Sequence, residues 1–200
     1  MTTHLGLQRI LLPSAQVSSL TTGSITLPSA RGAFVTTDYV SLGTSFITTN
    51  TTTVSFTSIP TTYKMLEIRC VTRSSGGDAG YGLKFNNDTT DANYAWQRNY
   101  YVASDTGTSS SYVGQMPTSS QDADTFGITL AQIWYADDSS KYTSWMSFTG
   151  EKRSSSGFSP QLLGVWKNTA QVTSIQVTCD TQGSTSQFAP YSRISLYGLK

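Results

Sequence analysis

The chain is poor in the residues that carry most enzyme chemistry. Its 200 residues include one histidine, His4, and two glutamates, Glu67 and Glu151, and charged residues make up only 12%. Enzymes generally hold acids, bases and nucleophiles together in clefts. A Ser-His-Asp triad would have to use His4 near the N-terminus, and a glycosidase would have to use the two glutamates as its carboxylate pair. We therefore expect a protein that is not an enzyme and that needs no cofactor.

The charge balance and the lack of long apolar runs exclude two kinds of partner. The chain has 13 basic and 12 acidic residues, a net charge of +1, and its basic residues are scattered. Nucleic-acid binding needs a clustered basic face, so we expect no nucleic acid. No run of 18 apolar residues exists, and the N-terminus lacks the regions of a signal peptide, so we expect no membrane either.

Cysteine is also scarce, with only Cys70 and Cys179, both in strand-like segments. The first interpretation is two buried thiols that act as small hydrophobic side chains. The alternative is a disulfide, which requires the two positions to be neighbours in the fold. A pair of cysteines does not decide the compartment.

What the chain has in abundance is hydroxyl, because Ser and Thr account for 61 of its residues. From about residue 39 onward, apolar and polar residues alternate with period two, and Ser/Gly-rich segments separate the runs. In one run Met146 and Phe148 share a face and Trp145 lies on the other. About eight to ten strands without a helical period predict an all-β fold. We expect an antiparallel jelly-roll-like β-sandwich, with an irregular β-barrel as the alternative.

The first part of the chain does not fit this pattern. Residues 1–38 show no clear alternation but hold several apolar side chains. An apolar, irregular segment of this kind orders on a partner surface. We expect an N-terminal arm over residues 1–50 for attachment and a β-sandwich domain over residues 51–200. The arm residues expected to contact partners are Leu7, Ile10, Leu11 and Leu12.

One loop is rich in side-chain oxygen. Asp88 and Asp91, among Asn86, Asn87 and Asn93, form the densest such cluster. These oxygens suit Ca²⁺, which makes Asp88 and Asp91 weak candidates for a metal site. The spacing is not that of an EF-hand, and an Asx-turn hairpin is the preferred interpretation.

Aromatic residues offer the remaining binding chemistry. Tyr and Trp present flat faces with a polar group, as glycan and protein interfaces use. We assign Trp96 and Trp166 to the core, and Tyr101, Tyr112 and Trp145 to surface contacts with a partner.

Four segments together resemble a known family. They are "TVSFTSIPTTYKMLEIRC" (53–70), "YGLKFNNDTTDANY" (81–94), "GVWKNTAQVTSIQV" (164–177) and "FAPYSRISLYGLK" (188–200). In order and spacing they resemble segments of small virion structural proteins of tailed bacteriophages, often from marine and cyanobacterial hosts. The family often has Gly before the final Ser-Arg, where this chain has Tyr191.

The resemblance implies a place in the virion, as a fibre, tail or head-decoration component. It implies a homotrimer, with other capsid or tail proteins as partners, since oligomerisation covers open sheet edges. We therefore expect a non-enzymatic decoration, cement or fibre protein that docks through its arm. The alternative is a receptor-binding tail module that recognises host surface glycan.

Overall fold

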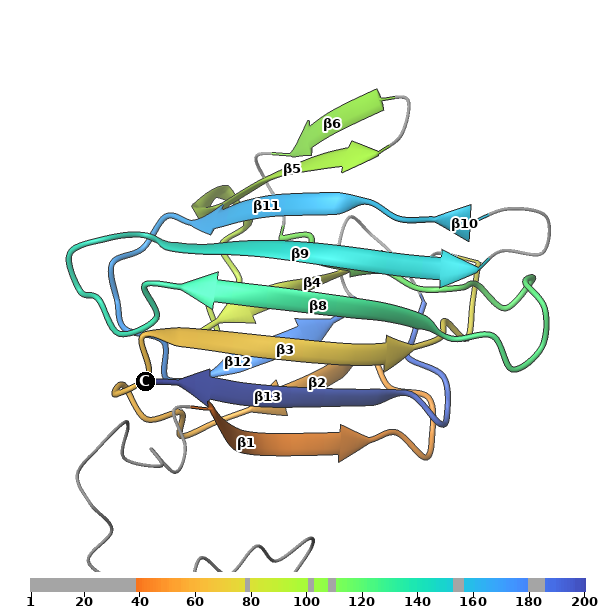
Figure 1. Ribbon diagram of the computed structural model, residues 1–200, viewed down its shortest axis with the longest axis horizontal. Coiled ribbons are helices and arrows are strands. Elements are labelled where there is room, and N and C mark those ends of the chain that lie inside the picture. The colour runs from red at the N-terminus through yellow and green to blue at the C-terminus, as the bar shows by residue number, and fades with distance from the viewer. Residues whose placement is uncertain (1–38, 78–79, 101–102, 108–110, 153–156, 180–185) are drawn as a thin grey trace, which may run out of the picture. The chain divides into compact units, whose positions relative to one another are not determined.

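The computed structural model describes residues 39–200 apart from 78–79, 101–102, 108–110, 153–156 and 180–185 (Figure 1). Within this part of the chain the regular elements are strands and one short 3₁₀ helix, η1 (Asp91–Asn93). The strands are β1 (Tyr39–Phe46), β2 (Thr53–Phe56), β3 (Met65–Thr72), β4 (Gly80–Phe85), β5 (Tyr94–Tyr100), β6 (Ala103–Gly107), β7 (Gly114–Gln115), β8 (Gly127–Trp134), β9 (Thr143–Lys152), β10 (Gly157–Phe158), β11 (Gln161–Trp166), β12 (Ile175–Thr178) and β13 (Arg193–Leu199). Among the described residues, no helix is long and apolar enough to cross a membrane.

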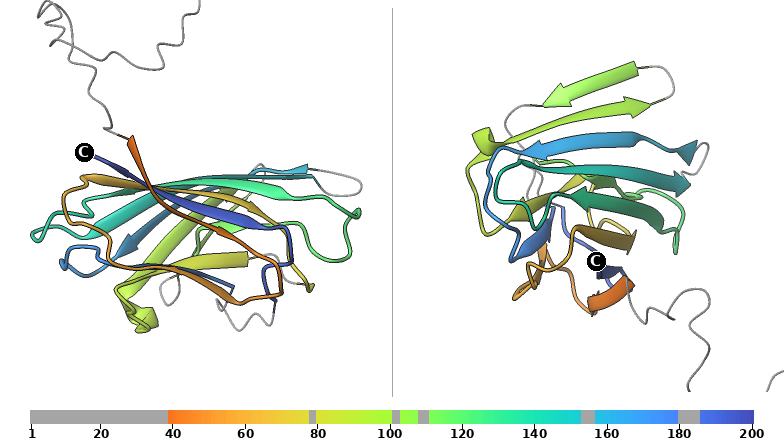
Figure 2. Two further views of the ribbon diagram at one scale, coloured as in Figure 1. Left: turned by 90° about the horizontal axis from the view of Figure 1, so that it is seen from below. Right: turned by 60° about the vertical axis from the view of Figure 1, so that its left-hand side comes forward.

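The strands form two antiparallel sheets that lie one against the other (Figure 2). The large sheet has nine strands in the order β1-β13-β3-β8-β9-β11-β5-β6, with β10 paired to β9. The small sheet has four, in the order β2-β12-β4-β7. The all-β class and the β-sandwich predicted from the sequence are therefore confirmed. This strand order does not confirm a jelly-roll topology.

The core lies between the sheets and is rich in aromatic rings. Phe85 of the small sheet is at its centre, with ring centroids of Trp166 and Trp145 at 5.4 and 5.8 Å. Trp96 and Trp166 are 7% and 1% exposed, which confirms their assignment to the core. Aromatic contacts of this kind stabilise a core beyond the effect of burial alone.

The sheet begins earlier than the sequence indicates. β1 pairs with β13 from Tyr39↔Leu199 to Phe46↔Arg193, so residues 39–46 belong to the sandwich and not to an arm that ends at residue 50. The pairing was hard to predict because β1 joins the other end of the chain and contains a bulge between Ser41 and Gly43. The arm positions Leu7, Ile10, Leu11 and Leu12 lie outside the described residues.

Both cysteines are free and buried, as the first interpretation predicted. Cys70 lies in β3 of the large sheet, and Cys179 follows β12 of the small sheet. Burial raises the pKa of each thiol to about 12. Both therefore stay protonated at neutral pH and pack as small hydrophobic groups.

Candidate functional site

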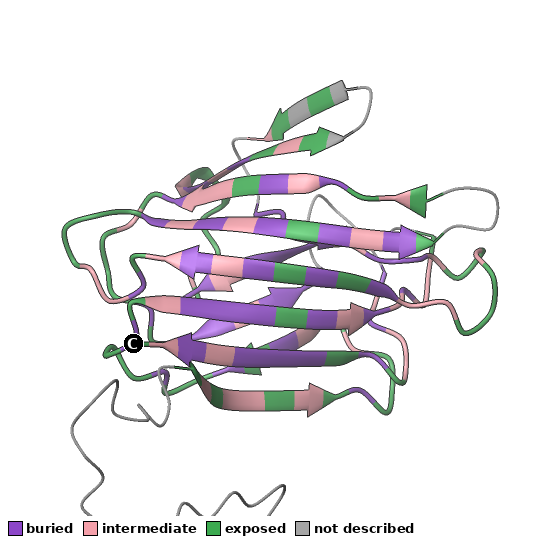
Figure 3. Cartoon of the chain, viewed as in Figure 1, coloured by how far each residue is buried: buried purple, intermediate pink, exposed green. Residues whose placement is uncertain are grey.

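The face of the large sheet that points away from the small sheet, here called the outer face, carries exposed apolar side chains. With the half-buried Met146 of β9, they form a continuous group on three neighbouring strands, here called the apolar stripe: Ile128 and Leu130 of β8, Phe148 of β9, and Leu163 of β11. Ile128 is 64% exposed and Phe148 49%. Figure 3 shows these three strands in the view onto the outer face, with exposed positions along each. Leu130 lies opposite Phe148, and Met146 opposite Leu163, so the side chains form adjacent cross-strand pairs.

Beneath the stripe, the inner positions 129, 147 and 149 of β8 and β9 hold small hydroxyl residues. The hydroxyls of Thr129 and Thr149 bond to each other at 2.8 Å, and Ser147 Oγ donates to the Val113 carbonyl at 2.5 Å. Residues 111–116 are largely buried, and the Gly114–Gln115 pair within them forms β7 of the small sheet. Beside these hydroxyl residues, the larger Ile128, Leu130 and Phe148 lie on the outer face.

The same packing corrects the prediction for Trp145. The indole was expected on the surface but is 1% exposed, and its Nε1 donates to the Tyr112 carbonyl at 3.0 Å. It lies against Gly164, where an added Cβ would come within 2.0 Å of the ring. A glycine on the paired strand thus provides the room that a buried tryptophan needs.

Tyr112 is also a correction, because it is 4% exposed and not a surface contact. Its ring packs against Trp96 at 5.1 Å, and Arg98 Nη1 donates to its hydroxyl at 3.3 Å. The Ser-rich residues before Tyr112 suggested an exposed loop. However, Val113 N–H donates to the carbonyl of Tyr81 in β4 at 2.9 Å, so the residues around Tyr112 lie beneath the large sheet. Tyr101, the third predicted contact, lies outside the described residues.

A groove of about 550 Å³ opens at one end of the apolar stripe. Its lining includes Trp134, Tyr135, Ser144, Met146 and Leu163. Successive residues of a strand point to opposite faces. Tyr135 has φ 61°, and this left-handed conformation turns the chain so that its ring lines the same groove as Trp134. Such strain in a bulky residue costs about 1–2 kcal/mol and is concentrated at functional sites.

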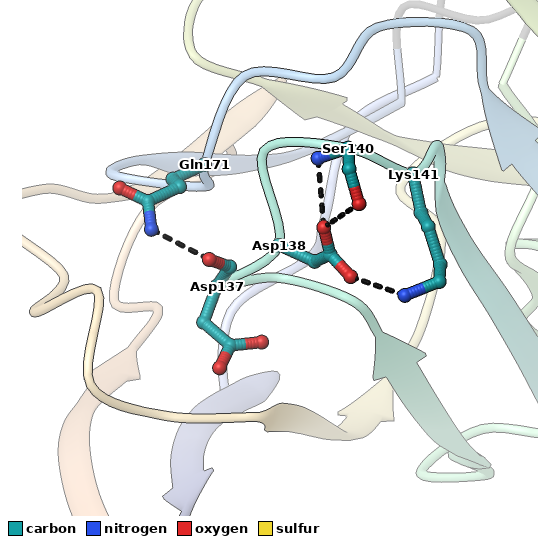
Figure 4. A network of polar contacts seen from close by, with 5 residues as sticks. All are labelled: Asp137, Asp138, Ser140, Lys141 and Gln171. Atoms are coloured by element: carbon teal, nitrogen blue, oxygen red, sulfur yellow. Dashed lines mark hydrogen bonds and ion pairs between the residues drawn. The ribbon is translucent and has the colours of Figure 1, made fainter.

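A polar network fastens the turn that follows β8 and Tyr135 (Figure 4). Asp138 accepts hydrogen bonds from Ser140 N–H at 2.7 Å and from Lys141 Nζ at 2.5 Å. The same ammonium lies 5.2 Å from the centroid of the Tyr135 ring. Gln171 Nε2 donates to the Asp137 carbonyl at 2.5 Å and fastens the turn to the segment before β12. Hydrogen bonds from Lys141 and Ser140 lower the pKa of Asp138.

A polar aromatic cluster on β1, β13 and β3 flanks the stripe on the side of β3. Tyr39 and Tyr197 stack at 4.9 Å, and the Arg69 guanidinium lies over both rings. Tyr39 Oη donates to Glu67, and Arg69 Nε donates to the same carboxylate oxygen at 2.8 Å. Although burial acts to raise it, the pKa of Glu67 is lowered by these hydrogen bonds. Glu67 is on the outer face but only 6% exposed, because Tyr39 and Arg69 bond to it there.

The carboxylate side chains that the sequence offered for catalysis and metal binding do not lie together in one site. Glu67 is on the outer face, whereas Glu151 is a buried inner position of β9, so the two carboxylates share no site. Asp88 accepts from Trp166 Nε1 and from Asn93 Nδ2, both at 2.8 Å, and so ties η1 to β11. In the described ranges, no group of three or more His, Cys, Asp or Glu side chains could hold a metal ion.

The outer face, with its apolar stripe and groove, is therefore the candidate functional surface. Of the residues predicted to contact a partner, the structure describes two: Tyr112 is buried away from this surface, and Trp145 is buried beneath the groove that it helps to line. The residues that form it lay in predicted strands, where alternation alone could not identify the solvent side. No family model matches the chain, and neither a search of curated proteins nor a search of solved structures finds a match.

Proposed function

We propose that the protein is a non-enzymatic structural component of a bacteriophage virion. Its sandwich belongs to a homo-oligomer, and residues 1–38 attach it to the capsid or tail as a decoration, cement or fibre protein. Its partners are other virion proteins and further copies of itself.

The observation that carries the proposal is the apolar stripe. Monomeric proteins rarely leave a contiguous apolar patch of several hundred Å² in water, and larger patches mark interaction sites. The stripe lies on central strands between polar flanks, which is the arrangement of a protein interface with an apolar centre and a polar rim. The Ser/Thr-rich composition and the four-segment resemblance support a place in a virion.

Purified particles test this proposal. Immunogold labelling and mass spectrometry are expected to find the protein on the particles. A variant that lacks residues 2–38 should remain folded but no longer be incorporated. Finding the full chain only in the soluble fraction, or finding normal incorporation of the truncated chain, would contradict the proposal.

A second function, recognition of host surface glycan, is favoured by the groove. Trp134 and Tyr135 line one groove because of a strained backbone, and Ser144 adds a hydroxyl next to them. Aromatic faces stack on the apolar faces of sugar rings, and polar groups fix their orientation.

Glycan arrays with the wild type and the Trp134→Ala variant test this alternative. Binding that is lost in Trp134→Ala but retained in a Tyr191→Asn control would support it. Tyr191 suits the control because its side chain is 88% exposed in the turn before β13. No binding to any host polysaccharide would count against it.

A further inference from the structure

The size and pattern of the outer face suggest what covers it. Four side chains of the apolar stripe are 37–64% exposed, which corresponds to an accessible apolar area on the order of 400 Å². A standard interface takes about 800 Å² from each partner, of which roughly 55–65% is apolar. The stripe and the aromatic rings of the groove together supply about that much. The area is therefore that of a stable protein–protein contact.

We propose that a second copy of the chain covers this surface, with the two outer faces packed against each other about a two-fold axis. This inference rests on the oligomeric part of the proposed function, and it takes a two-fold pair in place of the homotrimer that the family resemblance implies. The axis lies in the plane of the interface and runs across the strands, at the level of Ile68 in β3, Ala131 in β8 and Ser147 in β9. These residues are level in the sheet because Ile68 pairs with Ala131, and Ala131 with Ser147.

The ion pair on β3 is compatible with this symmetry. The axis exchanges the levels of Arg69 and Glu67, which lie one residue either side of Ile68. Because Glu67 is only 6% exposed and is bonded to Arg69 and Tyr39 of its own chain, each copy presents a neutralised ion pair at this level. The two-fold axis sets these neutralised pairs against each other, so the contact buries no unpaired charge on β3.

The shape of the surface is self-complementary about this two-fold axis. Ile128, the most exposed member of the stripe, and Trp134, at the groove, lie three residues either side of Ala131. The axis places Ile128 of one copy over the groove of the other, as a knob into a hole. Phe148 comes to lie over Met146 in the same way, because they flank Ser147. Sheets packed in this aligned manner are about 10 Å apart.

Sedimentation equilibrium of the full chain tests the pairing, and the expected mass is twice the chain mass of 21.7 kDa. Leu163→Lys introduces a charge into the stripe and should weaken the dimer at least 10-fold. The matched control is Gln176→Lys, a central position on the solvent side of the small sheet, which should leave the dimer unchanged. Circular dichroism confirms that both variants are folded. A monomeric or trimeric wild type, or an unaltered dimer in Leu163→Lys, would overturn the pairing.

Cross-linking tests the symmetry without weakening the stripe. Ser144 and Gly150 flank Ser147 in β9, so the axis places each over the other in the second copy. Within one chain they are six residues apart, about 20 Å, too far for a linker of about 10 Å. The Ser144→Cys/Gly150→Cys variant should give cross-linked dimers, and either single variant should not. Cross-linking by a single variant, or none by the double, would refute this symmetry. Particle incorporation is measured separately, so failure of the pairing and failure of the virion proposal are distinguishable.

Discussion

The fit of Trp145 against Gly164 gives the sharpest prediction about stability. In Gly164→Ala, the new Cβ would lie 2.0 Å from the indole. The ring cannot move freely, because it is 1% exposed, packs 5.8 Å from Phe85 and donates to the Tyr112 carbonyl. Overpacking costs about 1–3 kcal/mol, and a weakened hydrogen bond about 0.5–1.5 kcal/mol. The lower chain entropy of alanine recovers about 0.5–1 kcal/mol, so we expect a net loss of about 2–3 kcal/mol.

Gly150→Ala is the matched control, since Gly150 is also within a strand but a Cβ added there would have no other atom within 4 Å. The same substitution should there stabilise the protein by about 0.5–1 kcal/mol. Urea unfolding measures both at one protein concentration, because association shifts apparent stability. With a slope of about 2–3 kcal/mol per M, Gly164→Ala should lower the midpoint by about 1 M. A Gly164→Ala midpoint equal to that of the wild type would refute the packing argument.

Other predictions follow from single contacts. Asp88→Ala should cost about 2–3 kcal/mol, because it removes the acceptor of the Trp166 indole and the Asn93 amide. Hydrogen bonds lower the pKa of Asp88 in the folded state against the pull of burial. Its contribution is therefore present above the ordinary carboxyl pKa and lost as pH falls through the folded value, so thermal scans of wild type and Asp88→Ala should converge in acid. Cys70 and Cys179 should not react with a thiol reagent at pH 8 until the protein unfolds, since burial raises both pKa values to about 12. Rapid native labelling would contradict their burial. Removal of residues 2–38 should leave the near-ultraviolet circular dichroism unchanged, and its loss would show that the sandwich needs the arm.

The sequence predicted the β-sandwich because strand alternation and Ser/Gly-rich breaks are local signals. Trp96 could be assigned to the core because alternation along its strand puts it on one face with Tyr94, whereas the strand of Trp166, QLLGVW, has no such alternation. The pairing of β1 with β13 could not be foreseen, because it joins the two ends of the described chain.

The candidate surface was harder to predict for a physical reason. Alternation shows that a strand has two different faces, but it does not tell which face is in the core. In β9 the large indole of Trp145 points inward beside small hydroxyl residues, while Met146 and Phe148 point outward. Only the position of residues 111–116 beneath the strand, a contact between distant segments, decides this orientation. The left-handed conformation of Tyr135 likewise has no signal in the residue type.

The central claim is that the outer face of the large sheet is covered in the assembled protein. Cryo-electron microscopy of particles that carry the chain tests it most directly. We predict sandwich density on the particle with β8, β9 and β11 against a neighbouring subunit, related by a two-fold axis where that subunit is a second copy. Density in which this face meets only solvent, or particles without the sandwich, would contradict the account.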